Sequence, residues 1–128
     1  MTNNDFMVTI EETSLQNLTN RDKVMLKDTA DASSFDELLP DDTMEPVIVA
    51  VKDYAILSVH NENSDNKDYK KYLIIDTEGS KYVTGSDTFF RSFLDIYNEM
   101  AGEPFSIKVY KKPSTNFKGK FFLSCSIL

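Results

Sequence analysis

The last quarter of the chain alternates apolar and polar positions in two runs. Residues 105–110 place Phe105, Ile107 and Val109 on one side, and residues 120–127 repeat the pattern after a polar stretch. A period of two directs one set of side chains into a core and the other onto an open face. We therefore predict two strands joined by a turn. The open set is basic or aromatic: Lys108, Tyr110, Lys112, Lys118, Lys120 and Phe122.

The same alternation predicts earlier strands at residues 6–10, 21–27, 69–76 and 81–84, the first of them a short edge strand. The longest β-branched run covers residues 45–59. Val47, Val49 and Val51 fall on one of its sides, whereas Lys52 and Tyr54 fall on the other with Ile48 and Ala50. The second side is apolar at first and polar later, which predicts a long, bent strand that serves two halves of a barrel.

The period changes to three and four after Gly85. Apolar residues from Phe89 to Met100 then recur on one face, so residues 87–101 are predicted to form an amphipathic helix of about four turns. Gly102 and Pro104 end it. Its aromatic stripe is expected to pack into a core. Residues 35–39 are predicted to form one helical turn, which Pro40 ends.

The order of elements predicts the fold class. Several strands, one helix and two final strands suit a mainly β, five-stranded Greek-key barrel with its helix between the third and fourth main strands, which is the oligonucleotide/oligosaccharide-binding (OB) fold. A mixed α+β sandwich fits the pattern nearly as well. Residues 21–128 are expected to form a single OB-fold-like domain, preceded by a poorly patterned segment, residues 1–20.

Composition narrows the setting of the protein. The chain has 128 residues, 41% of them hydrophobic, which suits one domain with a real core. It has no apolar run long enough for a transmembrane helix and no secretory signal, so we expect no membrane contact. The single cysteine cannot form an internal disulfide and favours a cytoplasmic location, that of the host cell if the protein is viral.

Charge is distributed unevenly along the chain. The net charge is −7, but residues 1–66 hold 14 acidic and four basic residues, whereas residues 67–128 carry a net +3. No acidic residue follows Glu103. A chain of this kind can bind phosphate locally at its basic end, and such binding is expected to be sensitive to salt.

Catalytic groups are scarce. His60 is the only histidine and lies beside a polar loop, while Cys125 falls on a position that faces the core. The sequence has neither a Cys-x-x-Cys pair nor a phosphate-binding GxxxxGK loop. We therefore expect no enzyme, no metal and no cofactor. Lysines interleaved with aromatic residues on a β-ribbon instead favour a surface for single-stranded nucleic acid, since lysines meet phosphates and rings stack on bases.

The sequence also resembles a known family. The elements that carry the resemblance are the closing pair FSIKVYKKPSTNFKGKFFLSCSIL, the strand-turn-strand YLIIDTEGSKYVTGS, the helix after it, and the segment LLPDDTMEPVIVAV. In order and spacing over residues 20–128, the chain resembles the single-stranded DNA-binding proteins of small, protein-primed tailed bacteriophages. The resemblance implies an OB fold that coats displaced single strands during viral replication. It also implies that Tyr54 and Tyr82 bind the strand.

Together these arguments define a predicted binding groove and its partner, single-stranded DNA. The groove is expected among eleven residues: Lys52, Tyr54, Lys71, Tyr72, Lys81, Tyr82, Lys108, Tyr110, Lys118, Lys120 and Phe122. Lys71 and Tyr72 point to opposite faces of a strand, so at most one of them belongs there. Any surface that recruits replication proteins would lie in the acidic residues 1–66.

Two other functions remain open from the sequence. The acidic half could make the protein an interaction module or a DNA mimic of the same fold, which would bind DNA-binding proteins and ignore oligonucleotides. A small acidic barrel could equally be a viral assembly protein, which would form ordered multimers. The sequence predicts no oligomeric state.

Overall fold

The computed structural model describes residues 6–40, 45–114, 116 and 119–128, in which seven strands and three helices follow one another. They are β1 (Phe6–Thr13), α1 (Asn20–Lys27), β2 (Ser33–Ser34), α2 (Phe35–Leu38), β3 (Val47–Asn61), β4 (Asp68–Asp76), β5 (Lys81–Thr84), α3 (Asp87–Met100), β6 (Phe105–Pro113) and β7 (Phe121–Ile127). The strand order is β2-β5-β4-β3-β6-β7, and β1 pairs with β3. Every pair is antiparallel except β2 with β5.

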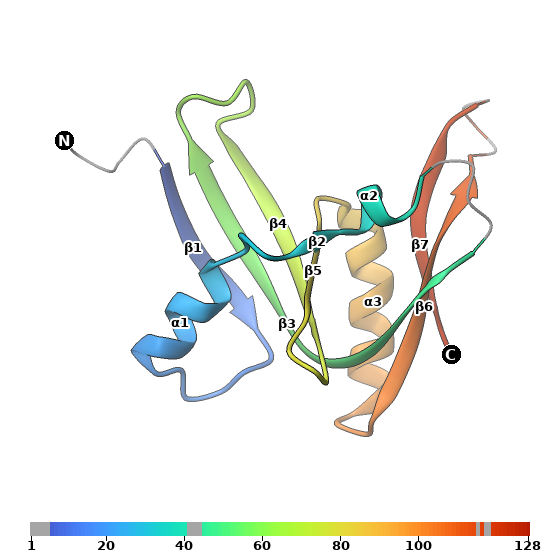
Figure 1. The fold of residues 1–128 in the computed structure, drawn as a ribbon, viewed down its shortest axis with the longest axis horizontal. Helices are drawn as coiled ribbons and strands as arrows, with labels where there is room; N and C mark the ends of the chain where they lie inside the picture. The colour runs from blue at the N-terminus through green and yellow to red at the C-terminus, as the bar shows by residue number, and fades with distance from the viewer. Residues whose placement is uncertain (1–5, 41–44, 115, 117–118) are drawn as a thin grey trace.

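The sheet divides into two arms at the bend of β3 (Figure 1). The first residues of β3, from Val47 to Val51, pair with β6, whereas its later residues pair with β4 and with β1. The left arm in Figure 1 therefore consists of β1, β3 and β4, and the right arm of β6 and β7. The prediction of a long, bent strand that serves two halves of the sheet is confirmed.

A β-bulge in β3 corrects one predicted orientation. The register with β4 shifts between Val51 and Asp53, so Lys52 is an extra residue in this strand. An extra residue reverses the alternation of the side chains that follow it. Tyr54 consequently lies in the same core as Val49 and Val51, and not on the face of Lys52 that simple alternation predicts.

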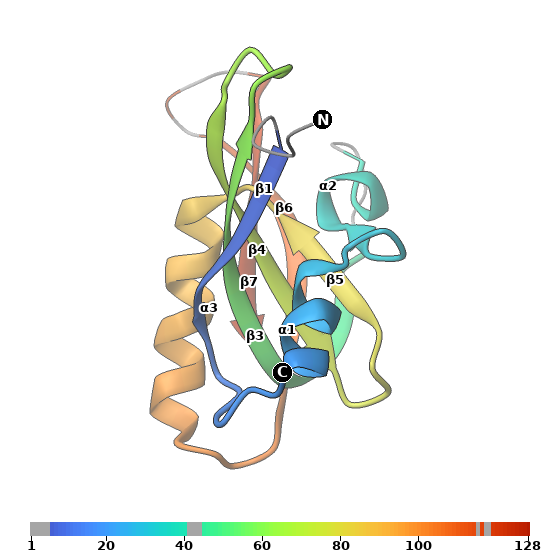
Figure 2. The same ribbon diagram turned by 90° about the vertical axis from the view of Figure 1, so that its left-hand side faces the viewer.

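Helix α3 fills the space behind the two arms. Figure 2 shows it on the opposite side of the molecule from α1 and α2. Ser86 caps its first turn, where the side-chain hydroxyl accepts a hydrogen bond of 3.2 Å from the Phe89 amide. Phe89, Phe90 and Phe93 are at most 1% exposed and meet the inner side of the sheet. The predicted helix and its core-packing aromatic stripe are both confirmed.

The predicted strand at residues 21–27 is wrong, because this segment forms the helix α1. Thr19 and Asp22 make a reciprocal capping box, in which each side chain accepts a hydrogen bond from the other residue's amide, at 3.1 and 3.0 Å. Leu26 is fully buried, whereas Val24 is 68% exposed, so the two do not share a face. Leu26 packs into a second, smaller core on the outer side of the sheet. The other buried residues of this core are Ala55 and Leu57 of β3 and Leu73 and Ile75 of β4.

The predicted fold class is confirmed at the level of a mainly β protein with one long helix before its last two strands. If β1 and the two-residue β2 are set aside, α3 lies between the third and fourth of the remaining five strands. Within the described residues no pairing joins β7 to β5, so the sheet forms a curled half-barrel. The segment before residue 21 contributes β1 to this sheet.

Candidate nucleic-acid interface

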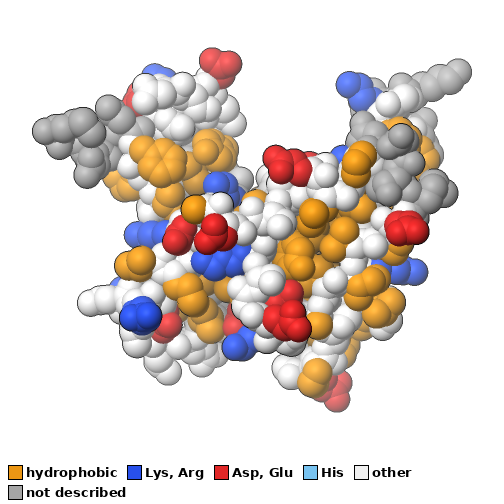
Figure 3. Space-filling view, in the orientation of Figure 1, with side chains coloured by type: hydrophobic (Ala, Val, Ile, Leu, Met, Phe, Trp, Pro, Cys, Tyr) orange, Lys and Arg blue, Asp and Glu red, His pale blue; other side chains and the backbone are white. Residues whose placement is uncertain are grey.

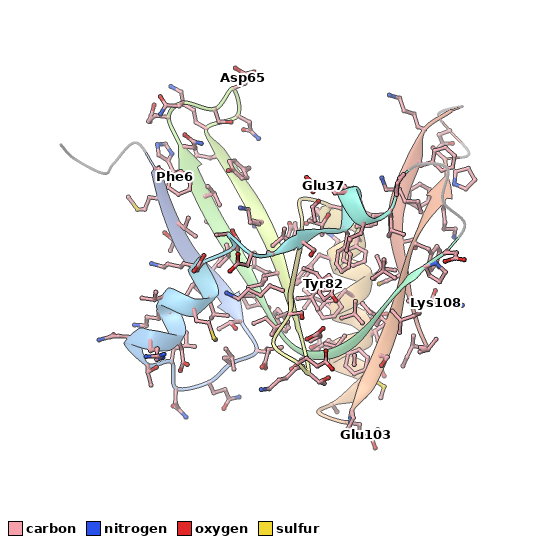
Figure 4. The ribbon with its side chains drawn as sticks, viewed as in Figure 1. Phe6, Glu37, Asp65, Tyr82, Glu103 and Lys108 are labelled. Atoms are coloured by element: carbon pink, nitrogen blue, oxygen red, sulfur yellow. The ribbon has the colours of Figure 1, made fainter. Side chains whose placement is uncertain are left out.

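The outer face of the right arm carries basic and aromatic side chains. Ile107 and Val109 of β6 and Leu123 and Cys125 of β7 are buried in the main core. Their neighbours along each strand must therefore point to the other side of the ribbon. We call this surface the outer ribbon face, and it consists of Lys108, Tyr110, Lys112, Phe122, Ser124 and Ser126. In Figure 4 the labelled Lys108 lies on the outside of this arm, away from α3.

The register brings these side chains together. Lys112 lies directly opposite Phe122, and Tyr110 lies opposite Ser124. Residues that face each other across antiparallel strands have Cβ atoms about 4.5–5.5 Å apart, and diagonal neighbours about 7–8 Å. Tyr110 and Phe122 therefore occupy diagonal positions with Lys112 beside them, and the Tyr110 hydroxyl reaches the other diagonal position, Ser126. Phe122 is 44% exposed, so a ring is available at the surface.

Tyr110 is held in place by its hydroxyl group. The Tyr110 and Ser126 hydroxyls form a hydrogen bond of 2.7 Å between β6 and β7. Hydrogen bonds with Ser126 and Ser124, and then the nearby charges of Lys112 and Lys108, lower the pKa of Tyr110 below its ordinary value. The ring thus has a fixed orientation in a locally positive environment.

The lysines of the outer ribbon face lack the ion pairs that other lysines of the described residues form. Lys67 and Lys70 form ion pairs with Glu62 and Glu11, each at 3.1 Å. In the described residues no ion pair is formed by four exposed lysines: Lys52, Lys108, Lys112 and Lys120. Their charges can therefore meet phosphate groups without first breaking a salt bridge. Lys118 lies outside the described residues.

Tyr54 and Tyr72 lie in the main core. They are 8% and 5% exposed, and each ring packs against Phe90, with centroids 5.8 and 4.6 Å apart. Their hydroxyls donate hydrogen bonds to Glu12 (2.8 Å) and Asp87 (2.9 Å). Burial, and then these hydrogen bonds, raise the pKa of both tyrosines to about 12. Neither ring is free to stack on a base.

Lys71 and Lys81 hold α1 and the loop after it against the sheet. The Lys81 ammonium donates hydrogen bonds to the carbonyl oxygens of Met25 and Asp28, at 2.5 and 2.6 Å. A cation at this position also opposes the negative end of the helix dipole. Lys71 donates to the hydroxyl of Thr29 at 3.2 Å. Both lysines therefore have structural partners away from the outer ribbon face.

In Figure 4 the labelled Tyr82 lies near the centre of the molecule, and Figure 3, in the same orientation, shows a notch between the two arms above this region. The half-buried Tyr82 ring stacks on Phe35, with centroids 5.2 Å apart and planes 8° from parallel. Burial, followed by the charge of Asp76, raises its pKa. Of the eleven predicted residues, the structure gathers Lys108, Tyr110 and Phe122 on the outer ribbon face, and Lys120 is an exposed residue just before β7. Lys52 is an exposed residue at the bulge of β3, four residues after Ile48, which lies opposite Lys108.

One aromatic residue was missed by the sequence analysis. Tyr69 precedes Lys71 by two residues in β4, so the two side chains share a face. It lines a hollow of about 170 Å³ together with Lys70, Lys71 and Asp36. The alternation that places Lys71 on the outer side of β4 also places Tyr69 there, so the signal was present in the sequence.

His60 lies at the far end of the left arm. Its Nδ1 is 2.7 Å from an Asp68 oxygen and its Nε2 is 2.7 Å from a Glu62 oxygen.

Burial raises the pKa of Cys125 to about 11, so this thiol stays protonated at neutral pH. The described residues include no group of histidine, cysteine and acidic side chains arranged to hold a metal ion. None of the described helices is long and apolar enough to cross a membrane.

Comparison with known proteins gives no relative for this chain: no protein-family model, curated protein or solved structure matches it. The resemblance to phage single-stranded DNA-binding proteins therefore stays a hypothesis from the sequence.

Proposed function

We propose that this protein binds single-stranded DNA without sequence preference, and that it coats and protects displaced strands during viral DNA replication in the host cytoplasm. The outer ribbon face is the observation that carries the proposal. Tyr110 and Phe122 offer two rings at diagonal positions, and Lys108 and Lys112 flank them without ion-pair partners in the described chain. The binding of nonspecific single strands combines these two elements, stacking platforms and a basic track.

The chemistry of this face predicts how binding depends on conditions. Each stacked base contributes about 1–3 kcal/mol, and every base has a ring, so affinity is tolerant of sequence. If four lysines neutralise phosphates, the logarithm of affinity should fall with the logarithm of salt concentration at a slope of about −3. Neither interaction reads the edge of a base, so specificity should be low.

The arrangement of strands supports an OB-type barrel as the scaffold. The long strand β3 pairs with β6 along its first residues and with β4 along its later ones, and α3 separates the third main strand from the last two. The OB fold is a partly open Greek-key barrel of five strands that binds oligonucleotides. The acidic residues of the first half would then remain for contacts with replication proteins.

Tyrosine fluorescence provides the test, because the chain has six tyrosines and no tryptophan. We would titrate the protein with oligothymidylate of about 30 nucleotides, several times the span of one OB domain, at low and moderate salt, with a duplex as control. Quenching by the single strand that salt weakens, and a much smaller effect of the duplex, is expected. No response to either at low salt would contradict the proposal and leave the interaction-module and assembly hypotheses.

Paired variants locate the site. Tyr110→Ala with Phe122→Ala should weaken binding by about tenfold or more, since each lost stacking contact costs about 1–3 kcal/mol. Phe6→Ala is the matched control, because Phe6 is also an exposed aromatic residue (54%) but lies on β1 in the other arm. Equal affinity of the double variant and wild type would show that binding uses another surface.

A further inference from the structure

The segment β2–α2 crosses the lower part of the notch between the two arms (Figures 1 and 3). It pairs with β5 through Ser33 and Ser34, and its next residue, Phe35, is fully buried. The Phe35 ring lies almost parallel to Tyr82, with 8° between the planes. A nucleobase stacked on Tyr82 would adopt this kind of geometry.

The residue after Phe35 supplies an anion. One oxygen of Asp36 lies 3.6 Å from the Lys111 ammonium, and the other accepts a hydrogen bond of 3.4 Å from the Thr84 hydroxyl. Lys111 belongs to β6 between Tyr110 and Lys112, and alternation directs its side chain inward, toward the notch. The Phe35 ring therefore stacks on Tyr82, and the Asp36 carboxylate pairs with Lys111. The base and the phosphate of one nucleotide could make the same two contacts.

We propose that Asp36 acts as a tethered competitor of nucleic acid: its carboxylate takes the place of a phosphate on Lys111, and a bound single strand displaces it. The inference rests on the proposed function and names a regulation of the same surface. A strand on the outer ribbon face would cross the edge of β6 near Lys111 and continue into the notch. The built-in anion lowers the affinity of this last contact.

Burial determines which residue of the β2–α2 segment can move when a phosphate binds. The Phe35 ring is in the main core and also packs on Phe89, with centroids 5.5 Å apart, so it stays in place. The Asp36 side chain is 54% exposed, whereas the Lys111 side chain is 10% exposed, so the carboxylate is the partner that can move out into water. A phosphate that brings a full charge and several acceptor oxygens can therefore replace this carboxylate without unfolding α2.

Space is available beside the competitor. The hollow of about 170 Å³ that contains Tyr69, Lys70 and Lys71 also includes Asp36 in its wall. A strand that displaces the carboxylate would therefore meet a further ring and further lysines on the left arm. The notch would then continue the basic and aromatic track from one arm to the other.

The experiment compares Asp36→Asn with Glu37→Gln. Both changes remove one negative charge from α2, but Glu37 forms no ion pair within the described residues. Binding of oligothymidylate is measured at several salt concentrations for wild type and both variants. We expect Asp36→Asn to bind roughly two- to fivefold more tightly, about the contribution of a weak ion pair. We also expect its salt dependence to steepen by about 0.7, because one more phosphate is neutralised.

The outcomes separate this inference from the proposed function. Equal affinities and slopes for Asp36→Asn and Glu37→Gln, with wild-type binding intact, would overturn the competitor and keep the function. Absence of binding in all three proteins would overturn both. A second measurement uses Asp36→Asn in a Lys111→Gln background, where the gain should vanish. A gain that persists there would mean that Asp36 does not act through Lys111, and would also overturn the inference.

Discussion

At the scale of single residues, His60 shows how hydrogen-bond geometry raises a pKa. Both ring nitrogens lie 2.7 Å from a carboxylate oxygen, one of Asp68 and one of Glu62. A neutral imidazole has one N–H and can donate only one of these hydrogen bonds, whereas the imidazolium donates both. The hydrogen bond to Asp68, and then the one to Glu62, accordingly raise the pKa of His60 above its ordinary 6.5.

This raised pKa gives a prediction with a definite sign. The contribution of the His60 contacts to stability is complete below the unfolded pKa and is lost as pH rises through the folded pKa. An NMR titration of the only histidine should give a pKa above 6.5, and Asp68→Asn should lower it more than Glu62→Gln, since Asp68 is the larger cause. Asp65→Asn, in the same exposed loop, is the control. A pKa that Asp68→Asn leaves unchanged would contradict the assignment.

Residue positions also show what alternation can and cannot predict. It placed Lys108 and Tyr110 on the open face correctly, because β6 is regular between Phe105 and Pro113. It misplaced Tyr54, because the bulge at Lys52 shifts the register and nothing in the apolar pattern marks a single extra residue. The side-chain partners of Lys71 and Lys81 lie on α1 or just after it, more than 40 residues earlier in the chain, so they could not be predicted from local sequence.

At the scale of elements, β3 to β7 and α3 could be predicted, because each has a run of residues at one period between clear turn or cap residues, a short run in the case of β5. Helix α1 could not be predicted from its apolar residues. Val24 and Leu26 alternate as in a strand, and only Leu26 is buried. The signal that identifies it is the capping box of Thr19 and Asp22. The Lys81 ammonium also donates a hydrogen bond to the Met25 carbonyl oxygen in the last turn of α1, which holds this turn against the sheet.

Because α1 has little buried surface, its cap should matter more than usual. Thr19→Ala removes the side-chain acceptor of the Asp22 amide and should destabilise the helix by about 1 kcal/mol. We expect faster hydrogen exchange in residues 20–28 than in wild type, without a change in β6 and β7. Ser92→Ala, at an exposed position inside α3, is the control. Unchanged exchange at residues 20–28 would show that Leu26 and Lys81 alone hold α1.

At the scale of the whole molecule, a chain of aromatic rings connects the two arms through α3. It begins with Tyr72 of β4, which stacks on Phe90 at 4.6 Å, and Phe90 meets Phe93 at 5.1 Å. Phe93 then meets Tyr97, which meets Phe105 of β6, both at 6.0 Å. Within the described residues the sheet joins the arms along β3, and these ring contacts add a further connection between them. We therefore expect the two arms to unfold together.

Substitution at the centre of this chain tests that cooperativity. Phe93 is fully buried, and Phe93→Ala should cost about 3–5 kcal/mol through lost contacts and the cavity left behind. Hydrogen exchange measured at increasing urea concentrations would follow β4 and β7 separately. Both arms should lose protection at the same, lower urea concentration than in wild type, whereas Phe6→Ala, at an exposed position, should shift it little. Loss of protection in β7 while β4 stays protected would show that the arms are independent. The notch between them would then be free to change its width, and the fixed spacing that the Asp36–Lys111 contact requires would depend on α2 alone.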